Sequence, residues 1–374
     1  MNVTNRVLRS IVVLLPLLSL FVWITRGQKS DPAPEASGKG HSIFSDWHRV
    51  SEVPILSPQA SSWESAGTFN PAVIFLPSMS DYYPLGASEP HHVLHPEKFV
   101  MLYRAQDYAG ISRIGYADSR DGIHFTRRSE PVLSPEADYE KEGGVEDPRL
   151  QRIDDVYYLT YTGYNKKDAQ LCLATSRDLI HWERKGVIVP ANRGNWNVKW
   201  TKSGAIVSQK INGKYWMYWL GTAADGTDQM GLSSSTDLLH WTEETATPVL
   251  PRREGRFDSR VVEPGPPPIV LRDRIVLVYN GADDHLVYRT GVANFDARDP
   301  RKLVWRTDEP IFQPERDWEK AGQVPNVVFV EGMTRTSTAI IKPDEEFLFY
   351  YGAADKYVGV ARARLRIQSH AMPN

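Results

Sequence analysis

Hydrophobic and aromatic residues alternate with polar residues in short runs along most of the chain, starting near residue 43. Five of these runs are rich in aromatic and β-branched residues: 98–105, 156–164, 214–221, 275–282 and 346–354. A period of two residues, interrupted by Gly, Asp and Pro, is typical of β-strands joined by turns. No stretch of comparable length shows the period of an amphipathic helix. The pattern therefore predicts a fold that is almost all β.

A short phrase recurs between these runs and defines a repeat. Its clear copies are ADSRDGIHF (117–125), ATSRDLIHW (174–182) and SSSTDLLHW (233–241), with a degenerate fourth copy at 295–305. Each copy is followed by a proline-flanked apolar turn, and PILSP at 54–58 supplies a fifth such turn without the phrase. Five turns indicate five units. The histidines that recur in the phrase, His124, His181 and His240, are expected to serve the repeat rather than one site.

Five β units of this length predict a five-bladed β-propeller over residues 43–374. The first strand, near PILSP, is expected to pair with the C-terminal strands, because closure removes exposed sheet edges. Segments with polar starts precede the aromatic runs at 69–75, 146–153, 202–208, 263–270 and 326–332. As the innermost strands of the blades, they would converge on one funnel-shaped pocket. Asn, Asp and Glu at strand starts also cap turns, so a structural role is the alternative.

The N-terminus has the layout of an export signal, since Arg6 and Arg9 precede an apolar run at 11–24. The run is short for a membrane span, which needs about 20 residues, and no small-x-small cleavage site follows it. Residues 1–26 are therefore predicted to be a signal anchor or a signal peptide. Residues 27–42 are rich in Pro, Gly, Ser and Ala and predict a flexible linker. The protein is thus expected to be exported, either anchored to a membrane or secreted or periplasmic.

Charge and cysteine content exclude several partners. The chain has 44 Lys plus Arg and 46 Asp plus Glu, a net charge of −2, which disfavours nucleic acid as a partner. The single cysteine, Cys172, forms no internal disulfide and disfavours a cysteine-based metal site. Three histidines lie close together at 91–95, within an insertion (81–96) that is predicted to be a surface loop. No resident metal is expected.

Several phrases resemble glycoside hydrolase family 130, the β-mannoside phosphorylases and β-mannosidases. They include GGVEDPRL (143–150), KSGAIVSQKINGKYWMYW (202–219), VYNGAD (278–283) and YYGAADKYVGVA (350–361). Each phrase alone is weakly specific, but their ordered combination runs from Trp47 to Ala361. The resemblance implies a five-bladed propeller, a β-mannoside oligosaccharide or glycan as substrate, and no cofactor.

The resemblance also implies that Asp147, the aspartate of EDPR, is the proton donor, acting through a hydroxyl of the bound mannose. Departure of the leaving alkoxide requires an acid whose pKa is raised, and Asp147 beside Glu146 is a candidate for such a shift. The alternative is a turn aspartate before Pro148. Further residues are expected to bind the sugar: Asn70, Arg104, Asp107, Arg149, Lys202, Asn326 and Asp355.

Hydrolysis and phosphorolysis differ in their need for cations, because phosphate is a dianion. Phosphorylases of the family are expected to carry a His-Arg-Pro phrase where this chain has Trp219-Leu220-Gly221, and a lysine where it has Glu263. These differences predict an inverting β-mannosidase with Asp147 as general acid and Glu263 as the base that activates water. Asp355 is a weaker candidate for the base.

Other functions remain open at this point. The first is a β-mannoside phosphorylase that uses inorganic phosphate and releases mannose 1-phosphate, with an anion site rebuilt from Arg252, Arg253 and Arg260. The second is a non-catalytic glycan-binding propeller, and the third a protein-interaction propeller. An arabinanase-type enzyme is disfavoured, since that group has carboxylates on three inner strands where only Asp147 matches here.

Overall fold

The structure, a computed structural model, describes residues 43–366 except 61–62, 83–90, 95 and 338–339. The predicted signal segment (1–26) and linker (27–42) lie outside the described residues. The described residues belong to one compact unit. Among them, no helix combines the length and apolar character needed to cross a membrane.

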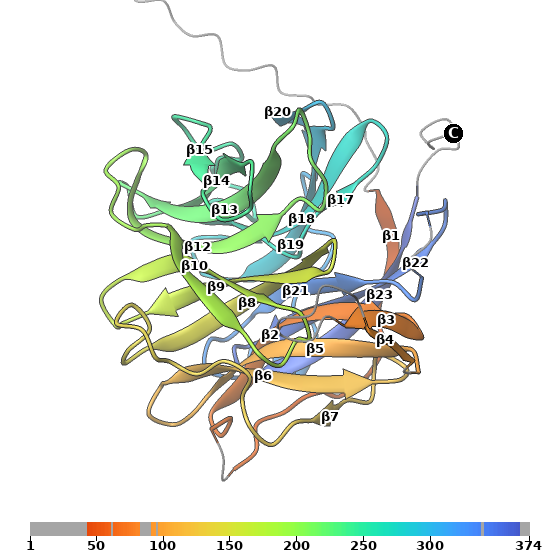
Figure 1. The fold of residues 1–374 in the computed structure, drawn as a ribbon. Helices are drawn as coiled ribbons and strands as arrows, with labels where there is room; N and C mark the ends of the chain where they lie inside the picture. Colours follow the sequence, from red (N-terminus) through yellow and green to blue (C-terminus); the bar gives the residue numbers. More distant parts are fainter. Residues whose placement is uncertain (1–42, 61–62, 83–90, 95, 338–339, 367–374) are drawn as a thin grey trace, which may run out of the picture. The chain divides into compact units, whose positions relative to one another are not determined.

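The strands form five antiparallel groups that follow one another along the chain (Figure 1). The first group contains β2 (Gly67–Leu76), β5 (Lys98–Gln106), β6 (Ser112–Ser119) and β7 (Thr126–Arg127). The second contains β8 (Gly144–Ile153), β9 (Val156–Tyr164), β10 (Ala169–Ser176) and β11 (Glu183–Val189). The third contains β12 (Asn197–Ile206), β13 (Tyr215–Ala223), β14 (Asp228–Ser235) and β15 (Thr242–Glu243).

The last two groups complete the set. The fourth contains β16 (Val261–Pro264), β17 (Ile269–Val270), β18 (Arg274–Ala282), β19 (Tyr288–Asp296) and β20 (Asp299–Arg306). The fifth contains β21 (Val328–Thr334), β22 (Glu346–Ala353), β23 (Tyr357–Leu365) and β1 (Phe44–Arg49). Among the described residues the one helix is α1 (Asp317–Lys320). The all-β prediction is confirmed, and the five groups are consistent with a five-bladed propeller-like fold.

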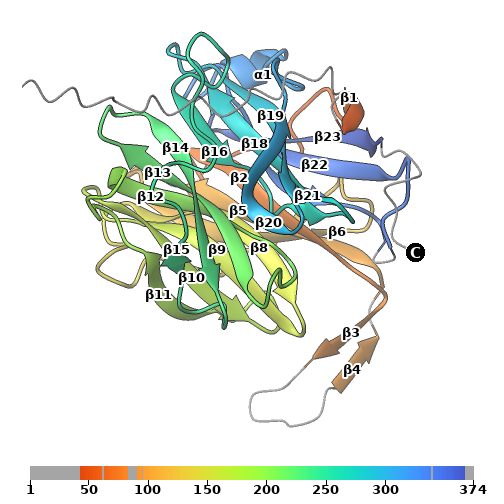
Figure 2. The ribbon, with the colours of Figure 1, turned by 90° about the horizontal axis from the view of Figure 1, so that it is seen from above.

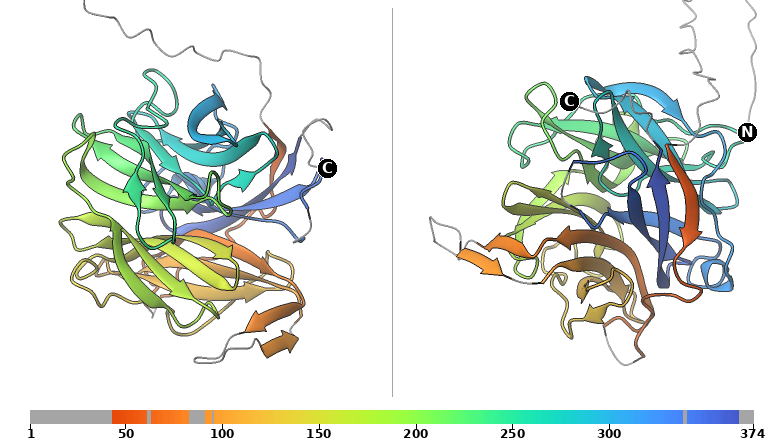
Figure 3. Two further views of the ribbon diagram at one scale, coloured as in Figure 1. Left: turned by 45° about the horizontal axis from the view of Figure 1, so that its top comes forward. Right: turned by 90° about the vertical axis from the view of Figure 1, so that its right-hand side faces the viewer.

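The N-terminal strand joins the last group of strands. β1 pairs antiparallel with β23, so that strands from the two ends of the described chain lie side by side (Figure 3). The PILSP segment, which the sequence suggested for this role, makes only a single bridge between Leu56 and Val358. The closing strand thus lies upstream of the predicted one, and the proline-flanked turn follows it.

The insertion after β2 is not simply a loop. β3 (Met79–Tyr82) and β4 (His91–Leu94) pair with each other as a separate two-stranded ribbon, which stands apart from the five groups in Figure 2. The prediction of a surface loop over 81–96 is therefore wrong for residues that lie in these strands.

The recurring phrase forms the same turn in three groups. In the first, Asp121 Oδ1 accepts hydrogen bonds from the backbone N–H groups of Ile123 and His124, and its Oδ2 lies 2.7 Å from His124 Nδ1. The contacts recur for Asp178 with His181 and for Asp237 with His240. An aspartate that accepts backbone N–H groups fixes a turn, so the repeated histidines have the structural role that their recurrence predicted.

A second repeated feature lies inside the strand groups, where a buried tyrosine donates to a carboxylate that also binds an arginine. We call these sets the outer triads: Tyr103–Glu64–Arg127, Tyr161–Glu140–Arg184, Tyr279–Asp258–Arg253 and Tyr351–Glu319–Arg49. The tyrosine O–H to carboxylate distances are 2.8–2.9 Å. The third group differs, with Trp196 and Arg193 on Glu243. Buried charges are tolerated because each has its partners.

Candidate active site

Each innermost strand carries a polar residue followed by Pro or Gly at an equivalent place. We call these five residues the polar ring: Asn70, Asp147, Ser203, Glu263 and Glu331. The strand pairing shifts register at four of them, and Asn70, Asp147 and Ser203 have φ values of 48°, 50° and 64°. Such β-bulges bend the strand and redirect a side chain, often beside an active site. The polar starts of the sequence thus converge, as predicted.

Asp147 lies at the centre of a network of donors. Its Oδ1 accepts a hydrogen bond of 2.7 Å from Asn70 Nδ2 and lies 3.0 Å from Arg104 Nη1. Arg104 also contacts Glu146 Oε1 through Nη2, at 2.6 Å. Ser112 donates to the same glutamate oxygen at 3.0 Å. One arginine therefore holds two adjacent carboxylates, Glu146 and Asp147, in a fixed geometry.

Arg149 connects three of the inner strands from a fully buried position. Its guanidinium donates to the carbonyl oxygens of Asp147 and Pro264 at 3.1 and 2.8 Å. Two glutamates flank it: Glu331 Oε1 at 3.3 Å from Nη1 and Glu263 Oε1 at 3.9 Å from Nη2. Neither carboxylate oxygen of Glu331 has a hydrogen-bond partner. Arg149 therefore positions the Asp147 backbone and offsets buried negative charge, rather than pointing freely at a substrate.

Glu263 is held by donors from the third inner strand. Ser203 Oγ donates to its Oε1, and Lys202 Nζ lies 3.7 Å from the same oxygen. The Glu263 side chain is 2% exposed and that of Lys202 is 23% exposed. Lys202 is thus the more exposed partner of this ion pair.

The pKa of Asp147 differs from the sequence-based expectation. Burial raises it, but the positive charges of Arg104, Lys202 and Arg149 and the Asn70 hydrogen bond outweigh burial and lower the pKa to about 2. Burial instead raises the pKa of Asp355 to about 6, although Arg104 opposes this. It also raises the pKa values of Glu146 and Glu263 against nearby cations. Asp147 is therefore ionised among these groups, and its neighbours hold protons more readily.

The predicted sugar-binding residues fall into two sets. Asn70, Arg104, Arg149 and Lys202 surround Asp147, and Asp355 faces the same cations from the turn between β22 and β23. Asp107 lies in the loop between β5 and β6, where its oxygens bind Arg113 and two backbone N–H groups of that loop. Asn326 precedes β21, and its carbonyl accepts the N–H of Tyr288.

The contacts of Asp107 recur elsewhere in the fold. Asp283, in the loop between β18 and β19, binds Arg289 and the N–H groups of His285 and Val287 in the same way. The same clamp in two strand groups indicates that Asp107 orders its loop. The arginines proposed for a rebuilt anion site differ too: Arg253 belongs to an outer triad and Arg252 pairs with Asp225, whereas Arg260 is exposed beside β16.

Two members of the polar ring, Ser203 and Glu331, were not among the residues predicted from the sequence. Glu331 was passed over in favour of Asn326, five residues earlier. The signal was present, since Asn70, Asp147, Glu263 and Glu331 each precede Pro or Gly in an inner segment. Ser203 precedes Gly204 in the same way. A ring position shared by all five segments identifies the site better than the first polar residue of each segment.

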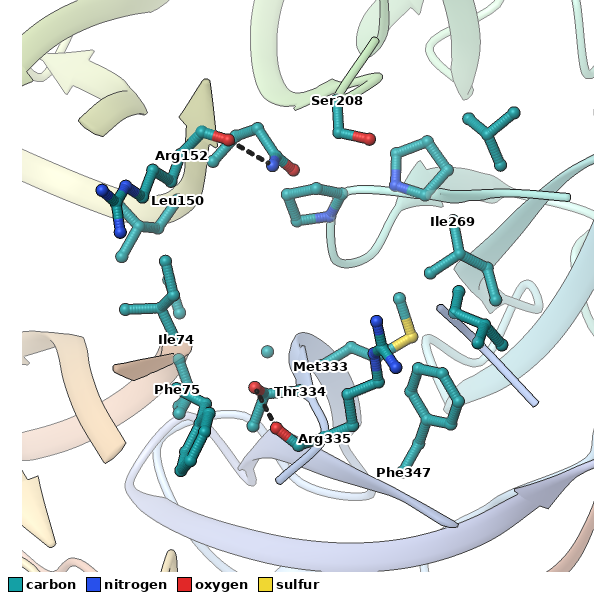
Figure 4. Close-up of a pocket in the computed structure, with 18 of the residues that line it drawn as sticks. Ile74, Phe75, Leu150, Arg152, Ser208, Ile269, Met333, Thr334, Arg335 and Phe347 are labelled. Carbon is teal, nitrogen blue, oxygen red and sulfur yellow. Dashed lines mark hydrogen bonds between the residues drawn. The ribbon is translucent and has the colours of Figure 1, made fainter. Parts of the chain in front are cut away.

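A cavity of about 620 Å³ lies at the far ends of the inner strands (Figure 4). Leu150 and Arg152 of β8, Ile74 of β2 and Met333 of β21 face it. Of the polar ring, only Glu331 lines this cavity. The cavity thus meets the Asp147 network at Glu331, and the rest of that network lies nearer the beginnings of the same strands. In the part of the chain that the structure describes, no group of three His, Cys, Asp or Glu side chains is arranged to hold a metal.

Comparisons with known proteins identify relatives over most of the chain. The chain is 37% identical over 324 residues to a 1,2-β-oligomannan phosphorylase of Thermoanaerobacter sp. (strain X514), covering 84% of this chain and 95% of the relative. A β-1,2-mannobiose phosphorylase of the same organism is 37% identical over 317 residues, with the same coverage. A solved structure matches with a TM-score of 0.70 and 34% identity, over 85% of this chain and 94% of its own. That structure was described with the statement that this family of mannoside phosphorylases contains glycoside hydrolases that target β-1,2 mannosidic linkages in Candida mannan.

The prediction of hydrolysis is wrong, because these relatives at 37% identity are phosphorylases. Hydrolysis was predicted because Trp219-Leu220-Gly221 stands where a His-Arg-Pro phrase was expected and Glu263 stands where a lysine was expected. Trp219 is fully buried and donates to Ser233, so this place faces the core rather than the site. The cations of the site come from Arg104, Arg149 and Lys202, on three different inner or neighbouring strands. The assignment of Glu263 as the base for water falls with hydrolysis.

The family itself is established by the extent of the match. The family model described as β-1,4-mannooligosaccharide phosphorylase covers residues 91–368. The five inner segments, the Asp147 network and the relatives at 37% identity agree with this assignment. The chain belongs to glycoside hydrolase family 130.

Proposed function

We propose that this protein is a β-mannoside phosphorylase that cleaves β-1,2-linked manno-oligosaccharides with inorganic phosphate, on a five-bladed β-propeller. The observation that carries the proposal is the convergence of Arg104, Arg149 and Lys202 on Asp147. A dianionic nucleophile requires cations beside the reacting carbon, and an acid must lie within reach of the leaving oxygen. The linkage follows the two relatives at 37% identity, whose names specify β-1,2 bonds.

The reaction assigns a step to each group. A phosphate oxygen attacks the anomeric carbon as the bond to the leaving oxygen breaks, and protonated Asp147 gives its proton to that oxygen. The product is mannose 1-phosphate and a shortened mannoside with a free hydroxyl. The proton that hydrogen phosphate loses on becoming a phosphate monoester restores Asp147. Lys202, which is partly exposed, contacts the phosphate, while Arg104 and Arg149 position Asp147 and no cofactor takes part.

The test is product analysis with purified full-length protein. β-1,2- and β-1,4-mannobiose are incubated with and without inorganic phosphate, and products are identified by mass. We expect mannose 1-phosphate from the β-1,2 substrate only when phosphate is present, and loss of the product in Asp147→Asn. Equal amounts of free mannose with and without phosphate would contradict the proposal.

A further inference from the structure

The active site contains more buried carboxyl groups than cations. Asp147 is faced by Glu146 from its own strand, Glu263 from β16, Glu331 from β21 and Asp355 from the turn between β22 and β23. Together with Asp147 these are five carboxyl groups. The cations that face them are Arg104, Arg149 and Lys202. Farther out, Asp228 and Tyr288 face Lys202.

The contacts divide four of the five carboxyls, all except Asp355, into two kinds. Glu146, Asp147 and Glu263 each have a cation within 4 Å and a hydrogen-bond donor from Ser112, Asn70 or Ser203. Three paired carboxylates balance three cations. Glu331 has Arg149 nearby but no hydrogen bond, and it is fully buried. An ionised carboxylate without hydrogen bonds in such a place is costly, so the group is held in its neutral form.

These groups therefore carry no net positive charge: three paired carboxylates offset the three cations, Glu331 is neutral, and Asp355, whose pKa burial raises to about 6, adds negative charge above that pH. A phosphate dianion that enters this site adds two negative charges to a region without spare cations. The low-dielectric surroundings strengthen the repulsion between the anion and the paired carboxylates. The site must lose negative charge for the anion to bind well, and proton uptake by a carboxylate is the available route.

We infer, given the phosphorylase activity proposed above, that phosphate binds together with a proton that the protein takes up, and that this proton arrives on the carboxyl cluster centred on Asp147. The chemistry agrees with the inference. In the ligand-free site the surrounding cations lower the pKa of Asp147 to about 2, which leaves it without the proton that an acid must donate. An anion beside Lys202 and Arg104 offsets their field and restores the proton affinity of Asp147. Phosphate thus supplies the nucleophile and also causes Asp147 to become protonated.

The experiment measures proton uptake when an anion binds to the full-length protein. Inorganic phosphate and inorganic sulfate are titrated calorimetrically near pH 7, each in two buffers with different heats of ionisation. Sulfate carries no proton at this pH, so every proton taken up with sulfate goes to the protein. We expect uptake of about one proton per bound sulfate, and sulfate affinity that falls about tenfold per pH unit above neutrality.

Two variants locate the proton. Asp147→Asn should reduce the uptake while retaining anion binding. Glu319→Gln, in an outer triad, should leave the uptake unchanged. Sulfate and phosphate binding without proton uptake, together with phosphate-dependent turnover, would overturn this inference and leave the proposed function standing. Failure to bind phosphate, together with turnover that does not depend on phosphate, would overturn both this inference and the proposed function.

Discussion

The outer triads and the polar ring use similar residues for opposite purposes. Each of four strand groups has its own tyrosine, carboxylate and arginine in contact. The distance from the tyrosine oxygen to the carboxylate is 2.8–2.9 Å in all four. At the polar ring the residues differ from strand to strand, with Asn, Asp, Ser, Glu and Glu in turn. A contact that recurs in each unit serves the unit, whereas a position that differs in each unit serves the one place where all units meet.

The two regions also differ in how their charges are balanced. Glu319 in an outer triad accepts bonds from Arg49, from Tyr351 and from two backbone N–H groups, and its pKa is lowered. Glu331 of the polar ring has no hydrogen bond, and burial raises its pKa well above the usual range. Fully satisfied charges stabilise a fold, while incompletely satisfied ones change protonation when a ligand arrives.

The largest effect is expected for Asp147→Asn. The amide keeps the shape and the contact with Arg104 but has no proton to give the leaving oxygen, so the phosphorolysis rate should fall about 10²–10⁴-fold. Thermal unfolding should change little, because removing a buried charge from a ring position removes a desolvation cost as well as an ion pair. A loss of activity that merely parallels a loss of folded protein would contradict the division between the two regions.

The reverse result is expected for Glu319→Ala in an outer triad. Arg49 and Tyr351 would be left buried without their carboxylate, which should lower the free energy of unfolding by about 3–5 kcal/mol. The rate per folded molecule should stay unchanged. Glu315→Ala is the matched control, since Glu315 pairs with the same arginine but is 58% exposed, and should cost at most about 1 kcal/mol. Denaturant titration measures the change in the free energy of unfolding, and specific activity measures the rate per folded molecule.

Lys202→Met should act on phosphate rather than on the sugar. The methionine keeps the length of the side chain and removes one charge-assisted hydrogen bond, worth about 1.5–3 kcal/mol. The KM for phosphate should therefore rise about 10–100-fold, with a smaller change in the KM for the mannoside. Equal changes in both constants would show that Lys202 has no particular relation to phosphate.

Gly359→Ala tests the packing of the outer triads. A Cβ at this position would lie 2.3 Å from the ring of Tyr351 on the neighbouring strand β22. Overpacking of this kind should lower the free energy of unfolding by about 1–3 kcal/mol. Full stability of Gly359→Ala would mean that the tyrosine shifts freely.

The smallest expected effect is a pH dependence of stability from Asp355. Its pKa is raised from 3.8 to about 6 by burial, so the folded state holds this proton more tightly than the unfolded chain. The stability that it contributes is complete below pH 3.8 and is lost as the pH rises through about 6. Asp355→Asn should flatten the fall in Tm between those pH values, and an unchanged Tm profile would show that Asp355 is ionised in the folded protein.

Much of the fold followed from the sequence, because repeated turns and alternating runs report local structure directly. The five inner segments were predicted for this reason, whereas Asp147 was assigned from the resemblance to the family. The closing strand was misplaced, since PILSP is a better sequence signal than residues 44–49, whose pairing with β23 is a long-range contact. The contacts that Asp107 makes within its own loop could not be predicted, because they depend on the conformation of that loop. The pKa of Asp147 depends on three cations brought together from separate strands, which no local pattern contains.

The choice of nucleophile can be tested directly with labelled water. β-1,2-Mannobiose is incubated with the protein in H₂¹⁸O that contains unlabelled inorganic phosphate. The masses of the sugar products are measured before mannose 1-phosphate hydrolyses. If phosphate attacks the anomeric carbon at the polar ring, mannose 1-phosphate should form and carry no ¹⁸O on that carbon. Two molecules of free mannose for each bond cleaved, with no mannose 1-phosphate, would show that water attacks, and would contradict the account.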